Sequence, residues 1–232
     1  MPNEEIEDAA TDFLCRYRNK YPGELKLPIC VPDILDCLDD FYVEIDDLQD
    51  KYGADILGAL FLDDDERRIV VDSSLDPETN PNMLGRYNFT VAHEAGHWVL
   101  HAPLLLAERK QPLLFDDSHS PVILCRSSRE SSKPERERQA DYFAGAVLMP
   151  KECVESQWRS IMGEVSPGVN VADEICPQQW TQKNWPKYNW MATCGIAKKF
   201  ALAFSVSATA AQIRLSDLGY ITLKRDNQLT LL

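Results

Sequence analysis

We expect no secretory signal and no membrane-spanning segment in this sequence. Its first eight residues are acidic where a secretory signal would be basic, and no apolar core follows them. The apolar runs, such as residues 104–106, fall far short of the roughly 18 residues that a membrane-spanning helix needs. We therefore expect no membrane partner and a cytoplasmic location.

Closely spaced pairs of cysteines are also missing from the sequence. The seven cysteines are an odd number, are scattered along the chain and include no C-x-x-C motif. This pattern indicates a reducing compartment, in which most of these side chains are expected to be small buried apolar residues.

Basic residues are scarce, with 24 lysines and arginines against 37 acidic residues and a net charge of −13. Such a charge repels nucleic acid over most of the surface and favours basic partners or basic protein substrates. The C-terminal stretch 196–232 differs, because it carries five basic and two acidic side chains. Nucleic-acid binding is therefore not expected for the main part of the chain and stays open for this stretch.

The remaining composition is that of an ordinary globular protein. The 232 residues are 44% hydrophobic and 26% charged, which suffices for one domain of ordinary size plus a small accessory module.

Helical spacing of apolar residues predicts four helices before residue 150. They are expected at residues 4–21, from 31 onward, at 84–101 and from 135 to just before Pro150. The third is expected to end at Pro103, because proline lacks the amide proton that a helix interior needs. The polar residues 107–136 are expected to form a long surface loop, of the kind that often carries function.

Strand-like sequence occupies residues 41–45, 56–62 and 68–71, and the acidic residues 63–66 are typical of a hairpin turn. A small, largely antiparallel sheet is implied. Together with the helices it predicts an α+β fold.

The C-terminal part predicts two helices at 196–204 and 207–218, with a serine N-cap and Gly219 after the second. Residues 220–224 and 229–232 suggest a closing hairpin, which gives a winged-helix-like outline. We expect residues 163–190 to be a packed connector. The predicted domains are therefore 1–190 and a helix-turn-helix or winged-helix-like module at 191–232.

Residues 93–97 read HEAGH and match the H-E-x-x-H motif inside a segment already predicted to be helical. Four residues are slightly more than one helical turn, so His93 and His97 can bind one zinc ion about 2.0–2.1 Å away. Glu94 lies beside them as a candidate general base. The pattern also occurs by chance, but here it takes two of the chain's four histidines.

A catalytic zinc needs a third protein ligand and one open position. His101 is rejected, because about 12 Å of helix rise separates it from His93, and it is expected to pack or hydrogen-bond instead. Glu137 is the best candidate, with Asp141 on the same helical face to orient a ligand imidazole. The competing interpretation is that both belong to a solvated charge run that begins at Glu135.

Several stretches resemble the ImmA/IrrE family of metallopeptidases. They are RYNFTVAHEAGH at 86–97, ERQADYFA at 137–144, LMP at 148–150, FSVS at 204–207 and RLSDLG at 214–219. The resemblance implies a zincin fold, one zinc per chain bound by His, His and Glu, and cleavage of helix-turn-helix repressors in stress responses and mobile elements. The loop 107–136 departs from that family's pattern.

The motif predicts metal-assisted peptide hydrolysis, with Glu94 as the proton acceptor and Asp141 orienting His93. Candidates for stabilising the oxyanion are Tyr142, His119 and Arg86. Two alternatives are a DNA-binding regulator whose zinc is structural and a degenerate zincin that acts as a binding module, such as an antitoxin.

Two further hypotheses concern the surroundings of the metal. Cys125 lies beside Arg126, which favours the thiolate, so it is a candidate latch that closes the open position of the zinc, with a plain buried cysteine as the alternative. An exposed edge strand, at 56–62 or 68–71, is expected to hold an extended substrate by strand addition.

Overall fold

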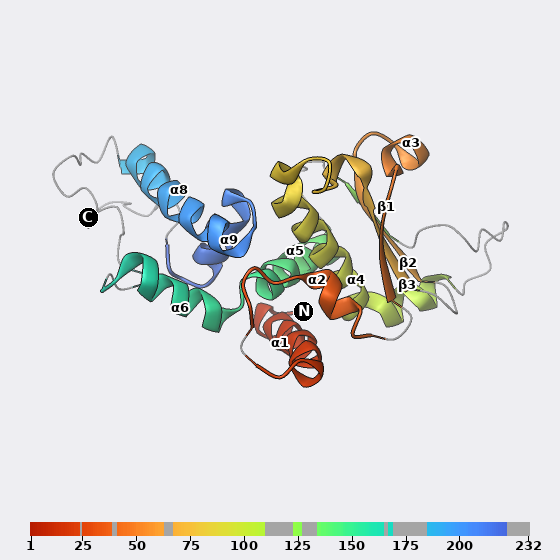
Figure 1. Ribbon diagram of the computed structural model, residues 1–232, viewed down its shortest axis with the longest axis horizontal. Coiled ribbons are helices and arrows are strands. Elements are labelled where there is room, and N and C mark those ends of the chain that lie inside the picture. Colours follow the sequence, from red (N-terminus) through yellow and green to blue (C-terminus); the bar gives the residue numbers. More distant parts are fainter. Residues whose placement is uncertain are drawn as a thin grey trace, which may run out of the picture. The chain divides into compact units, whose positions relative to one another are not determined.

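The computed structural model describes residues 1–23, 25–38, 41–62, 67–109, 123–126, 134–164, 167–168 and 185–221. The chain divides into two compact units, Met1–Pro150 and Lys151–Leu232, whose helices and strands are shown in Figure 1. The boundary between the units follows Pro150 and not residue 190, where the sequence suggests it. Helix α6 (Lys151–Met162) packs with helix α8 (Trp185–Phe204) and so belongs to the second unit.

The first unit opens with helix α1 (Asn3–Lys20) and the short helix α2 (Val31–Leu35), both as predicted. Pro32 lies in the first turn of α2, where a missing amide proton breaks no helical hydrogen bond. The apolar face of α1 packs on helix α5 (Glu135–Leu148), where Phe13 meets Phe143 edge-on at 5.8 Å between ring centroids. Burying such a side chain contributes about 1.5–3 kcal/mol.

The described sheet has four strands in the order β1-β3-β2-β4. They are β1 (Phe41–Asp46), β2 (Ile56–Leu62), β3 (Arg67–Asp72) and β4 (Ile123–Arg126). Strand β2 is antiparallel to β3 and β4, whereas β1 runs parallel to β3. The largely antiparallel sheet is thus confirmed, and one edge pair is parallel.

Strands β2 and β3 are both interior strands, so the hypothesis that one of them is an exposed edge for substrate is wrong. Strand β4 covers β2, pairing Cys125 with Gly58 and Leu124 with Ala59. The sequence placed β4 inside a loop, because its short apolar stretch has too few residues to predict a strand without knowing its partner. The edges of the described sheet are β1 and β4.

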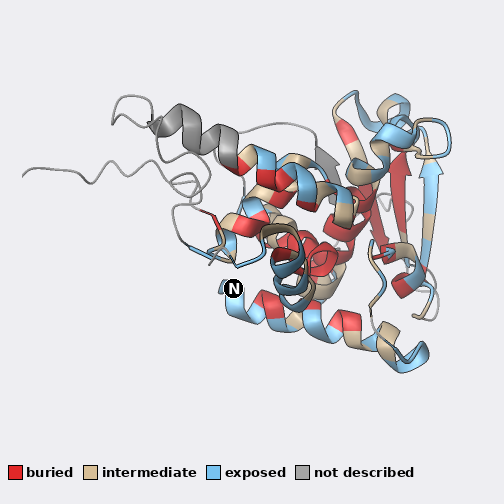
Figure 2. Cartoon of the chain, turned by 60° about the vertical axis from the view of Figure 1, so that its left-hand side comes forward, coloured by how far each residue is buried: buried red, intermediate tan, exposed pale blue. Residues whose placement is uncertain are grey.

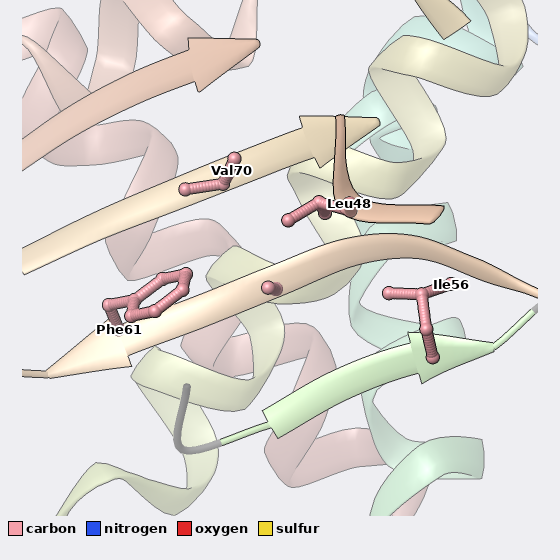
Figure 3. Close-up of a cluster of buried hydrophobic side chains, with 5 residues drawn as sticks. Leu48, Ile56, Phe61 and Val70 are labelled. Atoms are coloured by element: carbon pink, nitrogen blue, oxygen red, sulfur yellow. The ribbon is translucent and has the colours of Figure 1, made fainter. Parts of the chain in front are cut away.

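The two faces of β2 have different roles. One face carries an apolar cluster, shown in Figure 3, with Leu48 from the short helix α3 (Leu48–Tyr52). Its members are Leu48, Ile56, Ala59, Phe61 and Val70. The other face carries Gly58, which lies against the long helix α4 (Leu84–Arg109). Buried residues gather where the sheet, α4 and α5 meet (Figure 2).

Helix α4 continues past Pro103, so the prediction that it ends there is wrong. Pro103 removes one hydrogen bond, to the carbonyl of Val99. The residues that follow, Leu104 to Ala107, are strong helix formers, and Leu105 is buried. The helix propensity of these residues and the burial of Leu105 thus offset the hydrogen bond that is lost at Pro103. None of the described helices combines the length and apolarity that crossing a membrane requires.

The second unit contains α6, α8 and helix α9 (Ala208–Asp217). Trp158 of α6 is buried, with ring centroids 5.9 Å from Phe200 and 4.9 Å from Tyr220. Helix α8 begins at Trp185, so the connector predicted for residues 163–190 is wrong at its C-terminal end.

Two helices joined by a short turn, α8 and α9, are present in this unit as predicted, although α8 begins before the predicted residue 196. The Ser207 hydroxyl accepts a hydrogen bond from the amide of Ala210 at 3.0 Å, as an N-cap does. Gly219 follows α9 with φ of 76°, a conformation that favours glycine. The closing hairpin is predicted for residues 220–224 and 229–232, of which all but 220 and 221 lie outside the described residues, so the winged outline stays a prediction.

Candidate metal centre

Helix α4 places two imidazoles one turn apart on its buried face. His93 and His97 are 2% and 0% exposed, and their Nε2 atoms lie 3.1 Å apart. This arrangement follows from the helical spacing of the motif, since residues four apart share a face.

Helix α5 brings a carboxylate to the same point. The Oε2 of Glu137 lies 3.2 Å from Nε2 of His93, and its Oε1 lies 3.2 Å from Nε2 of His97. Gly96 lets the two helices approach this closely. A Cβ there would stand 3.2 Å from the Cα of Ala140 and 3.0 Å from the ring of Phe143.

The three side chains fit a metal ion. Their donor atoms all lie within 4.8 Å of one another. Ligand atoms about 2.0–2.1 Å from one tetrahedral zinc stand roughly 3.3 Å apart, close to the 3.1 Å between the two Nε2 atoms and to the 3.2 Å from each Nε2 to its nearer Glu137 oxygen. Two imidazole nitrogens and one carboxylate oxygen are also the donor set of a catalytic zinc that keeps a fourth position open.

The imidazole of His93 is held by a second carboxylate. Its Nδ1 lies 3.0 Å from Oδ1 of Asp141, one turn after Glu137 on α5. A carboxylate only accepts at this contact, so the proton belongs on Nδ1 and the lone pair of Nε2 faces Glu137 and His97.

The protonation states of the ligand residues suit a cation. Partial burial acts to raise the pKa of Glu137, but its close contacts with the imidazoles of His93 and His97 hold that pKa far below its ordinary value. Burial lowers the pKa of His97, against the opposing pull of Glu137. Near neutral pH the site therefore offers a carboxylate and a neutral imidazole, the forms that bind metal.

Glu94 is fully buried beside the ligands. Among the described residues, neither of its carboxylate oxygens has a hydrogen-bond partner, a rare state for a buried polar group. Burial raises its pKa to about 8, with His93 acting against the shift and Glu137 adding to it. A buried carboxyl with a raised pKa next to converging ligands marks a functional site rather than a structural one.

The backbone of strand β2 lies close to the Glu94 carboxyl at Gly58. A Cβ at this position would lie 2.9 Å from Oε1 of Glu94 and 2.6 Å from Cγ2 of Thr90. Gly58 and Gly96 were not predicted as parts of the site, although a glycine inside a strand or helix is itself a signal of close backbone approach.

Not every residue suggested by the sequence lies in this site. The Tyr142 hydroxyl donates to Oε1 of Glu7 on α1 at 2.9 Å and so links two helices, and its role as an oxyanion stabiliser stays a prediction. Arg86 is exposed on α4, about two turns before His93. His119 lies outside the described residues.

Cys125 stands on strand β4 and not in a loop, which corrects that part of the latch hypothesis. Its side chain lies outside the described residues, so the latch stays a prediction. His101 is not among the converging ligands, and its ring nitrogens contact His97 and Gln139 instead. The expectation that His101 forms hydrogen bonds is confirmed.

These features define a metal site of the metallopeptidase type. They are H-E-x-x-H on one helix, a glutamate on the next helix and a small mixed sheet behind them. A family model described as the IrrE N-terminal-like domain, Peptidase_M78, matches residues 52–175, a span that includes all three ligand residues. The chain belongs to this peptidase family, which confirms the resemblance. No curated protein matches the chain.

Proposed function

We propose that the protein is a zinc-dependent endopeptidase in which His93, His97 and Glu137 hold one zinc ion. The observation that carries this proposal is the convergence of these three ligands beside a buried carboxyl that has no hydrogen-bond partner among the described residues. Zinc is favoured over harder cations because two of the three donors are imidazoles.

When bound, the zinc ion supplies a Lewis acid that polarises the scissile carbonyl and makes water a better nucleophile. Glu94 takes the proton from the attacking water and delivers it to the departing amine. Asp141 keeps His93 in the tautomer whose Nε2 faces the ligand cluster. Tyr142, Arg86 and His119 remain candidates for stabilising the oxyanion.

The metal assignment predicts about one zinc per purified chain. His97→Ala and Glu137→Ala are each expected to lose bound zinc, because a site with only three protein ligands binds the ion much more weakly when one ligand is removed. Metal analysis after dialysis measures this, with Asp12→Ala, an exposed carboxylate on α1, as the matched control. Full occupancy in Glu137→Ala would remove Glu137 from the ligand set.

We propose that the substrate is a basic helix-turn-helix repressor, cleaved in a stress-response or mobile-element circuit in the cytoplasm. Support comes from the family assignment and from the net charge of −13, which attracts the basic DNA-contacting face of such a repressor. A helix-turn-helix protein encoded beside this gene would be the first candidate to test.

Charge steering has two measurable consequences. Association with the repressor is expected to slow markedly as salt rises from low to physiological strength, because exposed charges are screened. Operator DNA is expected to protect the repressor by covering the same basic face. Stopped-flow association and cleavage of free and DNA-bound repressor measure these effects. Salt-independent association together with equal cleavage of both forms would contradict the steering idea.

The helix pair α8 and α9 keeps DNA binding as a second candidate function. Lys198 and Lys199 are exposed on α8 and available to phosphates. Arg214, another of the basic residues of the stretch 196–232, is only 2% exposed and so is withdrawn from any such surface. The described part of the basic stretch is therefore weaker as a DNA-binding surface than its sequence indicates.

A further inference from the structure

The outer nitrogen of His97 begins a chain of hydrogen-bonding groups that the proposed reaction does not use. Nδ1 of His97 lies 3.3 Å from Nδ1 of His101, and Nε2 of His101 lies 2.9 Å from Oε1 of Gln139. The amide nitrogen of Gln139 then donates to Oε1 of Glu135 at 3.0 Å. His101 and Gln139 are 6% and 8% exposed.

The Glu135 carboxylate at the end of this series of groups sets the direction of each hydrogen bond in it. The Glu135 carboxylate can only accept, so Gln139 presents its amide nitrogen to Glu135 and its carbonyl oxygen to His101. His101 must therefore carry its proton on Nε2, which leaves a lone pair on Nδ1. That lone pair accepts the Nδ1 proton of His97 and leaves Nε2 of His97 free for a metal.

We propose that His101 is a positioning residue that fixes the tautomer and ring orientation of His97. This inference rests on the metal site proposed above. The two ligand imidazoles are thereby held differently, His93 by the carboxylate of Asp141 and His97 by a neutral imidazole. A neutral partner orients the ring without adding a further negative charge beside Glu94 and Glu137.

Space filling is the competing explanation, because His101 lies one turn after His97 and their ring centroids are 5.4 Å apart. The two explanations separate through the shapes of amide side chains. In Asn the carbonyl oxygen occupies nearly the place of the histidine Nδ1, whereas in Gln the terminal amide atoms reach the place of Nε2. Asn therefore keeps the acceptor for His97, and Gln keeps only the contact with Gln139.

The experiment compares zinc affinity in His101→Asn, His101→Gln and His101→Leu by competition with a chromophoric chelator. The Gln and Leu variants are expected to bind zinc about 10–100-fold more weakly than the wild type, and the Asn variant to stay within a few-fold. The visible absorption of the cobalt-substituted proteins is expected to change in the same two variants. Leu104→Ala, an exposed change on the same helix, is the control.

Equal zinc affinity in the Asn and Gln variants would overturn the proposal. Circular dichroism of each metal-free variant checks folding, and Gln139→Met provides a substitution outside α4 that is expected to weaken zinc binding by a smaller factor. Failure of the metal site itself would look different, because His97→Ala would then bind zinc as tightly as the wild type. Loss of zinc in His97→Ala but not in His101→Gln would sink the positioning role alone.

Discussion

Glu94→Gln is expected to keep its zinc and to cleave peptide at least about a hundredfold more slowly than the wild type. Glutamine has nearly the shape of glutamate but cannot accept the proton of the attacking water. The neighbouring ligands are untouched, since neither oxygen of Glu94 bonds to a described residue. Single-turnover cleavage of a repressor substrate, together with metal analysis of the same sample, measures both quantities.

The matched control is Glu4→Gln, the same chemical change at an exposed position on α1, which is expected to cleave at the wild-type rate. A Glu94→Gln protein that retains zinc and wild-type activity would assign the base to another group. The same experiment distinguishes the peptidase from an antitoxin-like binding module, because a module would cleave the repressor with neither side chain.

The parts of the site that depend on local geometry were predictable from the sequence. The spacing of His93 and His97 fixes their common direction on any α-helix, and Glu94 follows from its place between them. Glu137 lies on a different helix, and no rule of local structure joins it to the histidines. Its prediction needed the demand of a metal for a third ligand and the resemblance to a family.

Features that depend on packing between elements were not predictable in the same way. Pro103 satisfies the rule for a helix end, yet the helix continues because residues beyond it pack and favour helix. Strand β4 is only four residues long and becomes a strand by pairing with β2. Once paired, it turns β2 into an interior strand, which no pattern within β2 itself reveals.

The chain from His97 to Glu135 illustrates the same limit. His101 and Gln139 lie on different helices, and a histidine or glutamine on a helix is usually no more than a polar residue that packs. Only the close approach of α4 and α5, which Gly96 permits, makes them partners. A glycine inside the motif was the available signal, because glycine in a helix interior lowers helix stability unless packing requires it.

The metal-free protein is expected to lose stability relative to metal-free Glu94→Gln as pH rises from 5 to 8. Burial raises the pKa of Glu94 from 4.5 to about 8 in the folded protein, so unfolding releases a proton throughout this range. A carboxyl whose folded pKa is raised stabilises the fold below its unfolded pKa, and this contribution is lost as pH approaches the folded value.

The free energy of unfolding of metal-free Glu94→Gln, taken relative to that of the metal-free wild type, is expected to rise by about 1 kcal/mol at pH 5 and by roughly 4 kcal/mol at pH 8. Each pKa unit corresponds to about 1.4 kcal/mol. The difference at pH 8 is a large share of the 5–15 kcal/mol typical of a folded protein. Shifts at His97 and Glu137 are present in both proteins and largely cancel in the difference. Urea unfolding of both proteins in chelator at several pH values measures it. A difference in the free energy of unfolding that does not change with pH would mean that Glu94 titrates near its ordinary pKa, and the carboxyl would then be solvated in the metal-free protein rather than sealed against Gly58.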